Sequence, residues 1–320
     1  MRYDDSPPPP ESASSISPDR PWFARRPALV VALAALAPAC LAGWVLTQVL
    51  GGGPGSDAPQ PAGAKLAASS PAAAADAKAS AAPSAPPASP AAAPAKGPLA
   101  GRTVVIDPGH NTGNFKHGRE IDQQVDIGTN RKECDTTGTT TNSGYMEAEF
   151  SLDVSHRARA LLEAKGAKVV LTHDGERPWG PCIDERARIG NQAAADAVVS
   201  VHADGASAGN RGFHVILPAR VKGGAADTAK IVGPSRDLGE RIASNFARAT
   251  GSSPANYLGS GTGLVVRDDL GGLNLSTRPK VFIECGNMRD DKDAAQLMSP
   301  EWRQKAAQGI ADGITGFLGG

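Results

Sequence analysis

Short apolar runs that are rich in β-branched residues recur along the chain from residue 103 onward. They lie at 103–107 (TVVID), 168–172 (KVVLT), 197–202 (AVVSVH), 213–217 (FHVIL) and 280–284 (KVFIE). Apolar runs of this length between turn residues are typical of buried strands. The pattern therefore predicts a sheet built from these five segments.

Between these runs, apolar residues recur at every third or fourth position. The segments with this spacing are 147–165, 183–195, 235–250 and 299–318, and the first carries a stripe of Phe150, Val154, Ala158 and Leu161 behind Glu147. This spacing predicts amphipathic helices. Alternating strands and helices predict an α/β fold, with a mostly parallel central sheet and helices on both faces.

A long polar stretch separates His110 from Glu147 and shows neither a helical nor a strand period. It is rich in Gly, Asn and Thr. Loops of this length are either functional or disordered.

The N-terminal part has a different pattern. Residues 28–50 are apolar or small and uncharged for 23 positions, about the length that crosses the hydrocarbon core of a bilayer. Arg25 and Arg26 precede this run, and the next cation is Lys65. The positive-inside rule therefore predicts a membrane anchor with a cytoplasmic N-terminus and the remainder exported. A cleaved signal segment, leading to secretion, is the alternative.

Composition separates the rest of the chain into three parts. Residues 51–100 hold 20 Ala and 10 Pro with almost no large apolar side chain, which predicts a disordered linker. Residues 1–27, with PPPP and several Ser, predict a disordered cytoplasmic tail. Residues 101–320 then form one domain. The 33 Lys and Arg balance the 33 Asp and Glu, so no basic field favours nucleic acid as a partner.

Three of the predicted strands end in residues that can bind a metal ion or work beside one. His110 follows the first strand after Asp107, Pro108 and Gly109, His202 ends the third, and Glu284 ends the last. The carboxyl ends of parallel strands line the ligand crevice of an open α/β sheet, so we expect these side chains to converge. Two imidazoles and one carboxylate are a ligand set of catalytic zinc.

The third zinc ligand is expected to be Glu147, at the start of the first long helix, with Glu149 as the alternative. Glu284 then serves as the base that takes a proton from the attacking water. His117, His156 and His173 are expected at the surface. His214, within a strand near the crevice, can either orient substrate or be a hydrogen-bonded core residue.

Four short sequence motifs resemble those of a known family. VVIDPGH, YMEAEFSLDV, SVHAD and VFIECGNM occur in this order, and the chain also contains CDTTGTTTNSGYMEAE, CIDERARIGNQ and RDDLGGLNL. Together they resemble the zinc-dependent N-acetylmuramoyl-L-alanine amidases of the amidase-3 type, in particular actinobacterial cell-wall amidases. The resemblance spans about residues 102–318.

The resemblance implies a fold, a cofactor and an activity. It implies a single α/β domain with about six strands, a zinc ion on His110, Glu147 and His202, and a catalytic Glu284. It also implies cleavage of the lactyl amide of peptidoglycan, in wall remodelling or daughter-cell separation. One departure is Asn111, where many family members have Gly.

Other polar residues have weaker assignments. Arg267 and Asn274, in RDDLGGLNL, are expected to line the substrate groove with His214, although a structural turn explains this stretch equally well. Asp107 is expected to orient a loop or a ligand histidine. Arg186 is expected to be a helix residue bonded to Asp184 or to a strand end, and a substrate or structural ion pair is the alternative.

The cysteines suggest one covalent link. Cys134 and Cys182 lie in predicted loops of an exported domain, where a disulfide is permitted. We expect them to bond and to pin the 111–146 loop beside the helix that begins near Ile183. Cys40 and Cys285 are expected to be inert.

Two rival functions remain at this point. A zinc peptidase that acts within the stem peptide would use the same metal chemistry, and a non-catalytic wall-binding domain could keep the fold. The sequence leaves the oligomeric state open.

Overall fold

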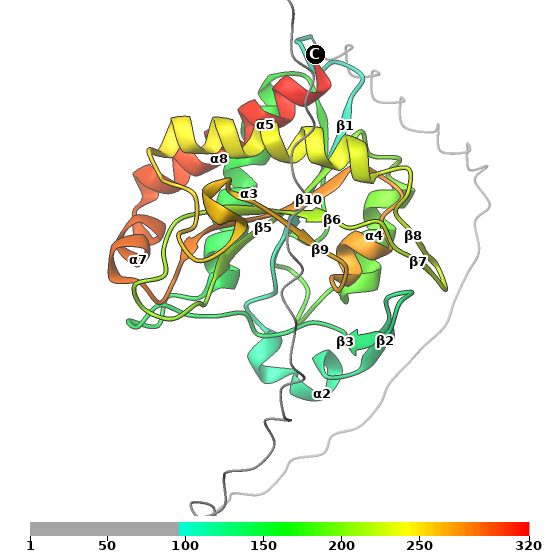
Figure 1. Cartoon of the computed structure of the whole chain (residues 1–320), viewed down its shortest axis with the longest axis horizontal. Helices are drawn as coiled ribbons and strands as arrows, with labels where there is room; N and C mark the ends of the chain where they lie inside the picture. Colours follow the sequence, from blue (N-terminus) through cyan, green and yellow to red (C-terminus); the bar gives the residue numbers. More distant parts are fainter. Residues whose placement is uncertain (1–95, 320) are drawn as a thin grey trace, which may run out of the picture. The chain divides into compact units, whose positions relative to one another are not determined.

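A six-stranded sheet forms the centre of the computed structural model, which describes residues 96–319. The strand order is β4-β1-β5-β10-β6-β9, and the sheet is drawn in Figure 1. The bounds are β1 Thr103–Pro108, β4 Lys168–Leu171, β5 Ala197–Asp204, β6 His214–Pro218, β9 Leu264–Arg267 and β10 Lys280–Asn287. Every neighbouring pair is parallel except β10 and β6. The predicted α/β fold with a mostly parallel sheet is confirmed.

The four predicted helices are present with nearly the predicted bounds. They are α3 Glu147–Ala164, α4 Ile183–Gln192, α5 Val232–Thr250 and α8 Pro300–Leu318. Several short elements were not predicted: α2 Gly118–Ile121, α6 Gly271–Asn274, α7 Asp291–Met298, the 3₁₀ turns Asn114–Lys116 and Gly259–Gly261, and two hairpins, β2 Gln124–Asp126 with β3 Arg131–Glu133 and β7 Lys222–Gly223 with β8 Ala226–Asp227. These elements are too short to show a period.

The two faces of the sheet have different compositions. Successive side chains of a strand point to opposite faces, and one face carries the apolar set Val104, Ile106, Val199, Val201, Val281 and Ile283. Helices α3 and α5 pack on this face, and α8 packs on both of these helices, as can be followed in Figure 1. Their buried side chains, such as Phe150, Ile242 and Ile310, complete the main core.

The opposite face carries α4 and, beside it, a set of polar side chains. Helix α4 approaches it closely at Gly190, where an added Cβ would lie 3.2 Å from Val198. The alternate strand positions on this face are Asp107, Ser200, His202, Lys280, Phe282 and Glu284. The strand period therefore brings the predicted site residues of β5 and β10 to one face.

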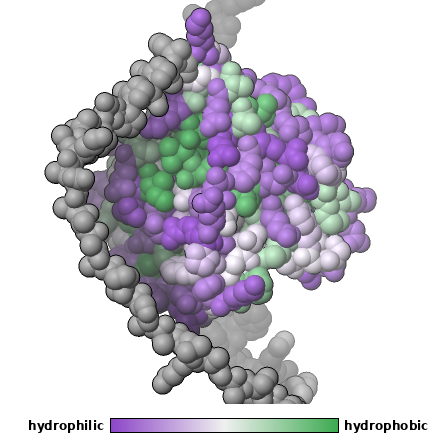
Figure 2. Space-filling model, turned by 180° about the vertical axis from the view of Figure 1, so that it is seen from behind, coloured by the Kyte–Doolittle hydropathy of each residue, from purple (hydrophilic) through white to green (hydrophobic). Residues whose placement is uncertain are grey.

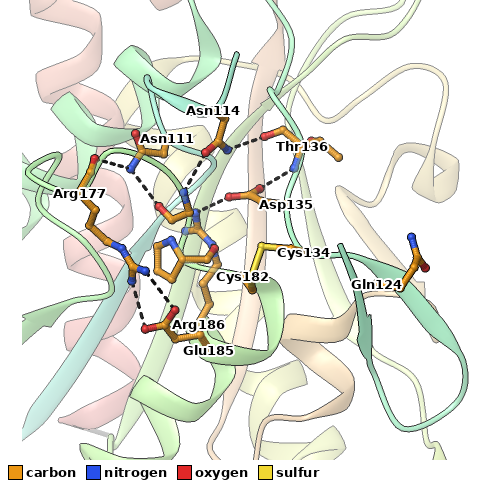
Figure 3. Close-up of a disulfide and its surroundings, with 12 residues drawn as sticks. Asn111, Asn114, Gln124, Cys134, Asp135, Thr136, Arg177, Cys182, Glu185 and Arg186 are labelled. Atoms are coloured by element: carbon orange, nitrogen blue, oxygen red, sulfur yellow. Dashed lines mark hydrogen bonds and ion pairs between the residues drawn. A yellow bond between two sulfur atoms is a disulfide. The ribbon is translucent and has the colours of Figure 1, made fainter. Parts of the chain in front are cut away.

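The predicted disulfide is present between Cys134 and Cys182 and is drawn in Figure 3. The backbone N–H of Ile183 donates to the carbonyl of Cys134 at 2.7 Å. The disulfide therefore joins the 111–146 loop to the residue directly before α4, as the sequence predicted. Cys285 is a buried free cysteine.

The expectation that His173 lies at the surface is wrong, because its residue is only 6% exposed. His173 follows β4, and its Nε2 lies 3.0 Å from the carbonyl oxygen of Pro108. Its Nδ1 accepts from the N–H of Gly175. Both contacts suit a neutral imidazole. Burial, with the nearby Arg186 guanidinium, lowers the pKa of His173 from 6.5 to about 4.

This buried imidazole makes folding stability depend on pH. The unfolded chain binds the extra proton below about pH 6.5, whereas the folded chain resists it until about pH 4, so stability is lost as the pH falls between these values. In urea unfolding of the full-length chain, His173→Gln should lower the free energy of unfolding at pH 7 relative to the wild-type chain. We expect this difference from the wild type to be about 2 kcal/mol smaller at pH 5. Leu162→Ala, a core change without a titrating group, should show the same deficit at both pH values. A His173→Gln deficit that does not change with pH contradicts the prediction.

The N-terminal expectations concern residues that lie outside the described range: the tail 1–27, the membrane or signal segment 28–50 and residues 51–95 of the linker. None of the helices in residues 96–319 combines the length and apolar character that crossing a bilayer requires. Seen from behind, this part of the chain has a largely hydrophilic surface with one gathered apolar patch (Figure 2).

Candidate metal centre

His110 follows β1 at the point where the chain leaves the sheet. Its φ of 60° places it in the left-handed region, which few non-glycine residues adopt. Ser151 on α3 donates to the carbonyl of Gly109 at 2.7 Å and holds this turn. Gly109 has no substitute here, because an added Cβ would lie 2.4 Å from the His202 ring. The Pro-Gly-His motif thus allows His110 and His202 to lie side by side.

Glu147, the first residue of α3, lies between the two imidazoles. Its Oε1 is 3.2 Å from His110 Nε2 and 2.9 Å from His202 Nδ1. The N–H of Thr139 donates to Oε2 at 2.9 Å. Burial disfavours the charged carboxylate, but His110 and His202 hold the pKa of Glu147 well below its usual range. The ligand atoms of the three residues lie within 4.8 Å of one another.

Glu149, the alternative ligand, has a different contact. Its carboxylate accepts from the backbone N–H of Met146 at 3.2 Å and caps the start of α3. The residue is exposed. The structure therefore brings Glu147, and not Glu149, to the two histidines.

Glu284 lies beside this cluster on β10. It is in register with His202 of β5 on one side and with His214 of β6 on the other. Its Oε2 is buried and has no hydrogen-bond partner among the described residues. Burial, together with the carboxylates of Glu147 and Asp204, raises the pKa of Glu284 well above its ordinary value. An unpaired, buried carboxyl group of this kind is typical of an acid or base in a catalytic site.

A groove passes over this cluster. Its walls include Thr139, Asp204, Ile216, Arg267, Leu270 and Phe282 as well as the two histidines and two glutamates. The Phe282 ring stacks on His202 with a centroid distance of 5.2 Å. Gly138 must be glycine, because an added Cβ would lie 2.8 Å from the His110 ring. Nothing in the sequence pattern singled out Phe282 or Gly138, since both act through contacts between distant segments.

The three expected substrate contacts lie in different surroundings. Arg267, at the end of β9, is partly exposed in the groove and pairs with Asp269. His214 is buried in β6 in register with Glu284 of β10 and packs edge-on against Tyr257. Asn274 is buried in α6 and donates to the carbonyl of Asp268 and to Thr129. Of the three, only Arg267 lines the groove, and Asn274 serves the structural turn that was the alternative.

Of the remaining histidines, His117 is partly exposed near Glu120 and His156 pairs with Asp174 on the surface of α3.

Asn111, which the resemblance marked as a departure from the family pattern, is buried. Its amide donates to the carbonyls of Arg177 and Gly180, as Figure 3 shows. The Asn111 side chain thus ties the turn after β1 to the segment before α4.

A mostly parallel α/β domain in which two histidines from the carboxyl side of the sheet and the glutamate that begins α3 could hold a metal ion, next to a glutamate without a hydrogen-bond partner at Oε2 among residues 96–319, is typical of a metal-dependent enzyme. Comparison with known proteins then gives the family. The chain belongs to the Amidase_3 family, described as N-acetylmuramoyl-L-alanine amidase, which matches residues 104–316.

Individual relatives agree with this family. The chain is 42% identical over 221 residues to N-acetylmuramoyl-L-alanine amidase Rv3717 of Mycobacterium tuberculosis, covering 69% of this chain and 88% of that protein. It is 40% identical to the solved N-acetylmuramyl-L-alanine amidase Ami1 of Mycobacterium smegmatis, with a TM-score of 0.63, over 69% of this chain and 98% of that one. Ami1 of Mycobacterium abscessus gives the same identity and TM-score over its whole length.

Proposed function

We propose that the protein is a zinc-dependent amidase that hydrolyses the bond between the lactyl group of N-acetylmuramic acid and the L-alanine of the peptidoglycan stem peptide. The observation that carries the proposal is the cluster of His110, Glu147 and His202 beside the unpaired carboxyl group of Glu284. Family membership supplies the substrate class. This substrate lies outside the cytoplasmic membrane, in agreement with the export expected from residues 28–50.

The three residues fit a zinc ion by both chemistry and spacing. Tetrahedral zinc with bonds of about 2.1 Å has ligand atoms about 3.4 Å apart. The nitrogens of His110 and His202 lie 3.2 and 2.9 Å from Glu147 Oε1. Two imidazoles and one carboxylate are a ligand set that catalytic zinc sites use, so these three residues would hold the ion.

The side chains divide the reaction between them. Zinc, when bound, polarises the scissile carbonyl and makes water more acidic. His110, Glu147 and His202 hold the metal. Glu284 takes one proton from the attacking water on its unpaired Oε2 and delivers it to the nitrogen of L-alanine as the C–N bond breaks. The products are a lactyl carboxylate on the glycan and a peptide with a free amino terminus. Arg267, in the same groove, offers a cation for a carboxylate of the stem peptide.

Product analysis tests this function. Purified peptidoglycan is digested with the full-length chain, with and without a chelator, and the fragments are identified by mass. We expect stem peptides that begin with free L-alanine and glycan strands that retain the lactyl group, and we expect the chelator to abolish both. Shortened peptides still attached to the glycan would identify a peptidase. Unchanged peptidoglycan would identify a binding domain without catalysis.

A further inference from the structure

Arg186 on α4 is buried and uses every N–H group of its guanidinium. The Nε–H donates to the carbonyl of Pro181, and the two terminal nitrogens donate to four more oxygens. These four are Asp107 Oδ1 at 2.9 Å, the carbonyl of Pro108 at 2.6 Å, the carbonyl of His110 at 3.0 Å and Asp135 Oδ2 at 2.9 Å. Arginine has five N–H donors in a rigid planar fork, so no donor remains free. Figure 3 shows the fork facing Asp135.

Two of these bonds hold the backbone that presents His110. The guanidinium bonds the carbonyls of Pro108 and of His110 itself, on either side of the turn where His110 has a φ of 60°. A non-glycine residue in this region is strained by about 1 kcal/mol or more and needs surrounding contacts to keep it there. Arg186 supplies such contacts from a different element.

A third bond reaches the ring of His110 through Asp135. While one Asp135 oxygen accepts from Arg186, the other lies 3.3 Å from His110 Nδ1. The carbonyl of Thr136 is also near this nitrogen, at 3.1 Å. His110 Nε2 faces Glu147. Asp135 and Thr136 therefore accept at Nδ1 and leave Nε2 as the nitrogen that faces the candidate metal position.

The fourth bond leads to His202. Asp107 Oδ2 accepts from the hydroxyl of Ser200 at 2.9 Å, and the Ser200 oxygen lies 3.2 Å from His202 Nε2. Lys280, fully buried in β10, also bonds Asp107 at 3.0 Å. The two carboxylates of Asp107 and Asp135 are thus balanced by the cations of Arg186 and Lys280. Asp107 reaches His202 only through Ser200.

We propose that Arg186 is a positioning residue for the metal centre, which holds both candidate histidine ligands through one network: His110 through its backbone and Asp135, and His202 through Asp107 and Ser200. The proposal rests on the zinc site of the proposed function. It assigns a role to a residue whose five N–H donors all bond oxygens of the protein and leave none for metal-bound groups or substrate. Groups that fix the second nitrogen of a ligand histidine typically change metal affinity 10- to 100-fold.

Zinc affinity of the full-length chain, measured by competition with a chromophoric chelator, tests the proposal. We expect Arg186→Lys to raise the Kd for zinc at least 10-fold, since lysine offers only three donors from one point and cannot span both carboxylates. Asp135→Asn and Ser200→Ala, which each act on one histidine, should raise it about 10-fold. Arg177→Lys is the matched control. Arg177 precedes α4 and its side chain pairs with Glu185, a residue of the same helix as Arg186, rather than with a candidate metal ligand.

A purely structural role has a different signature. It would lower the melting temperature of the zinc-free Arg186→Lys protein but leave the zinc Kd of the folded fraction unchanged. If Arg186→Lys does not fold, Asp135→Asn and Ser200→Ala decide, and a wild-type Kd in both overturns the proposal. Absence of zinc binding by the wild-type chain would instead overturn the zinc site, and the proposed function with it. Zinc binding without peptidoglycan cleavage would contradict only the proposed activity.

Discussion

Glu284→Gln is expected to lower the rate of peptidoglycan cleavage by about 100- to 10,000-fold while the protein keeps its zinc. The amide has nearly the shape of the carboxyl group but cannot take a proton from water. Glu284 Oε2 has no hydrogen-bond partner among residues 96–319, so the exchange breaks no bond in the described structure at that atom. The measurements are the initial rate of peptide release and the zinc content by elemental analysis.

Variants of the proposed zinc ligands should differ from Glu284→Gln in their zinc content. His110→Ala, Glu147→Ala and His202→Ala each remove a group that contributes binding energy to the metal, so zinc and activity should be lost together. Glu149→Ala is the matched control. It removes a carboxylate two residues from Glu147, one that caps α3, and should keep zinc and most of the activity. A zinc-free Glu284→Gln protein would make Glu284 a ligand, and a zinc-free Glu149→Ala protein would refute the assignment of Glu147.

Removal of the disulfide is expected to destabilise the domain by about 4 kcal/mol, the chain-entropy estimate for a loop of this length. The bonded cysteines are 48 residues apart in the sequence. Asp135 follows Cys134, and Arg186 lies one helical turn beyond Cys182, so the link also holds the two halves of the Arg186 network together. The measurement is the free energy of unfolding in urea of the full-length Cys134→Ser/Cys182→Ser double variant.

Reduction of the native protein provides the control. A reductant should lower the stability of the wild-type chain by a similar amount and should leave the double variant unchanged. Intact-mass measurement after alkylation without reductant should show both thiols protected. Labelling of Cys134 and Cys182 in the unreduced protein would contradict the bond itself.

Strong local patterns were sufficient for most of the fold. The β-branched runs at 103–107, 168–172, 197–202, 213–217 and 280–284 each became a strand of the sheet, because each contains three consecutive apolar residues, a pattern that favours a strand buried on both faces. Strand β9 escaped prediction because its LVVR run has half-exposed residues beside a glycine-rich turn. The hairpin β2–β3 is polar and only three residues long on each side, so nothing but its neighbours determines it.

The site divides in the same way. The sequence by itself predicted that His110, His202 and Glu284 come together, because parallel strands present their carboxyl ends at one edge. The predicted strand ends at 202 and 284 were too early, since β5 continues to Asp204 and β10 to Asn287. Only the tertiary structure decided that Arg186 and Asp135 belong with them. Those two residues meet the site across 76 and 25 positions of sequence from His110, a contact that no local period encodes.

Which polar side chains are buried also depended on the tertiary structure and not on the local sequence. Lys280 and His173 are polar residue types, yet both are buried, because partners from other segments satisfy their hydrogen-bonding groups. A polar group can leave water only if such partners compensate its lost hydration. The hydrophobic pattern therefore determines which segments form the core, and the packed fold determines which polar groups are buried with them.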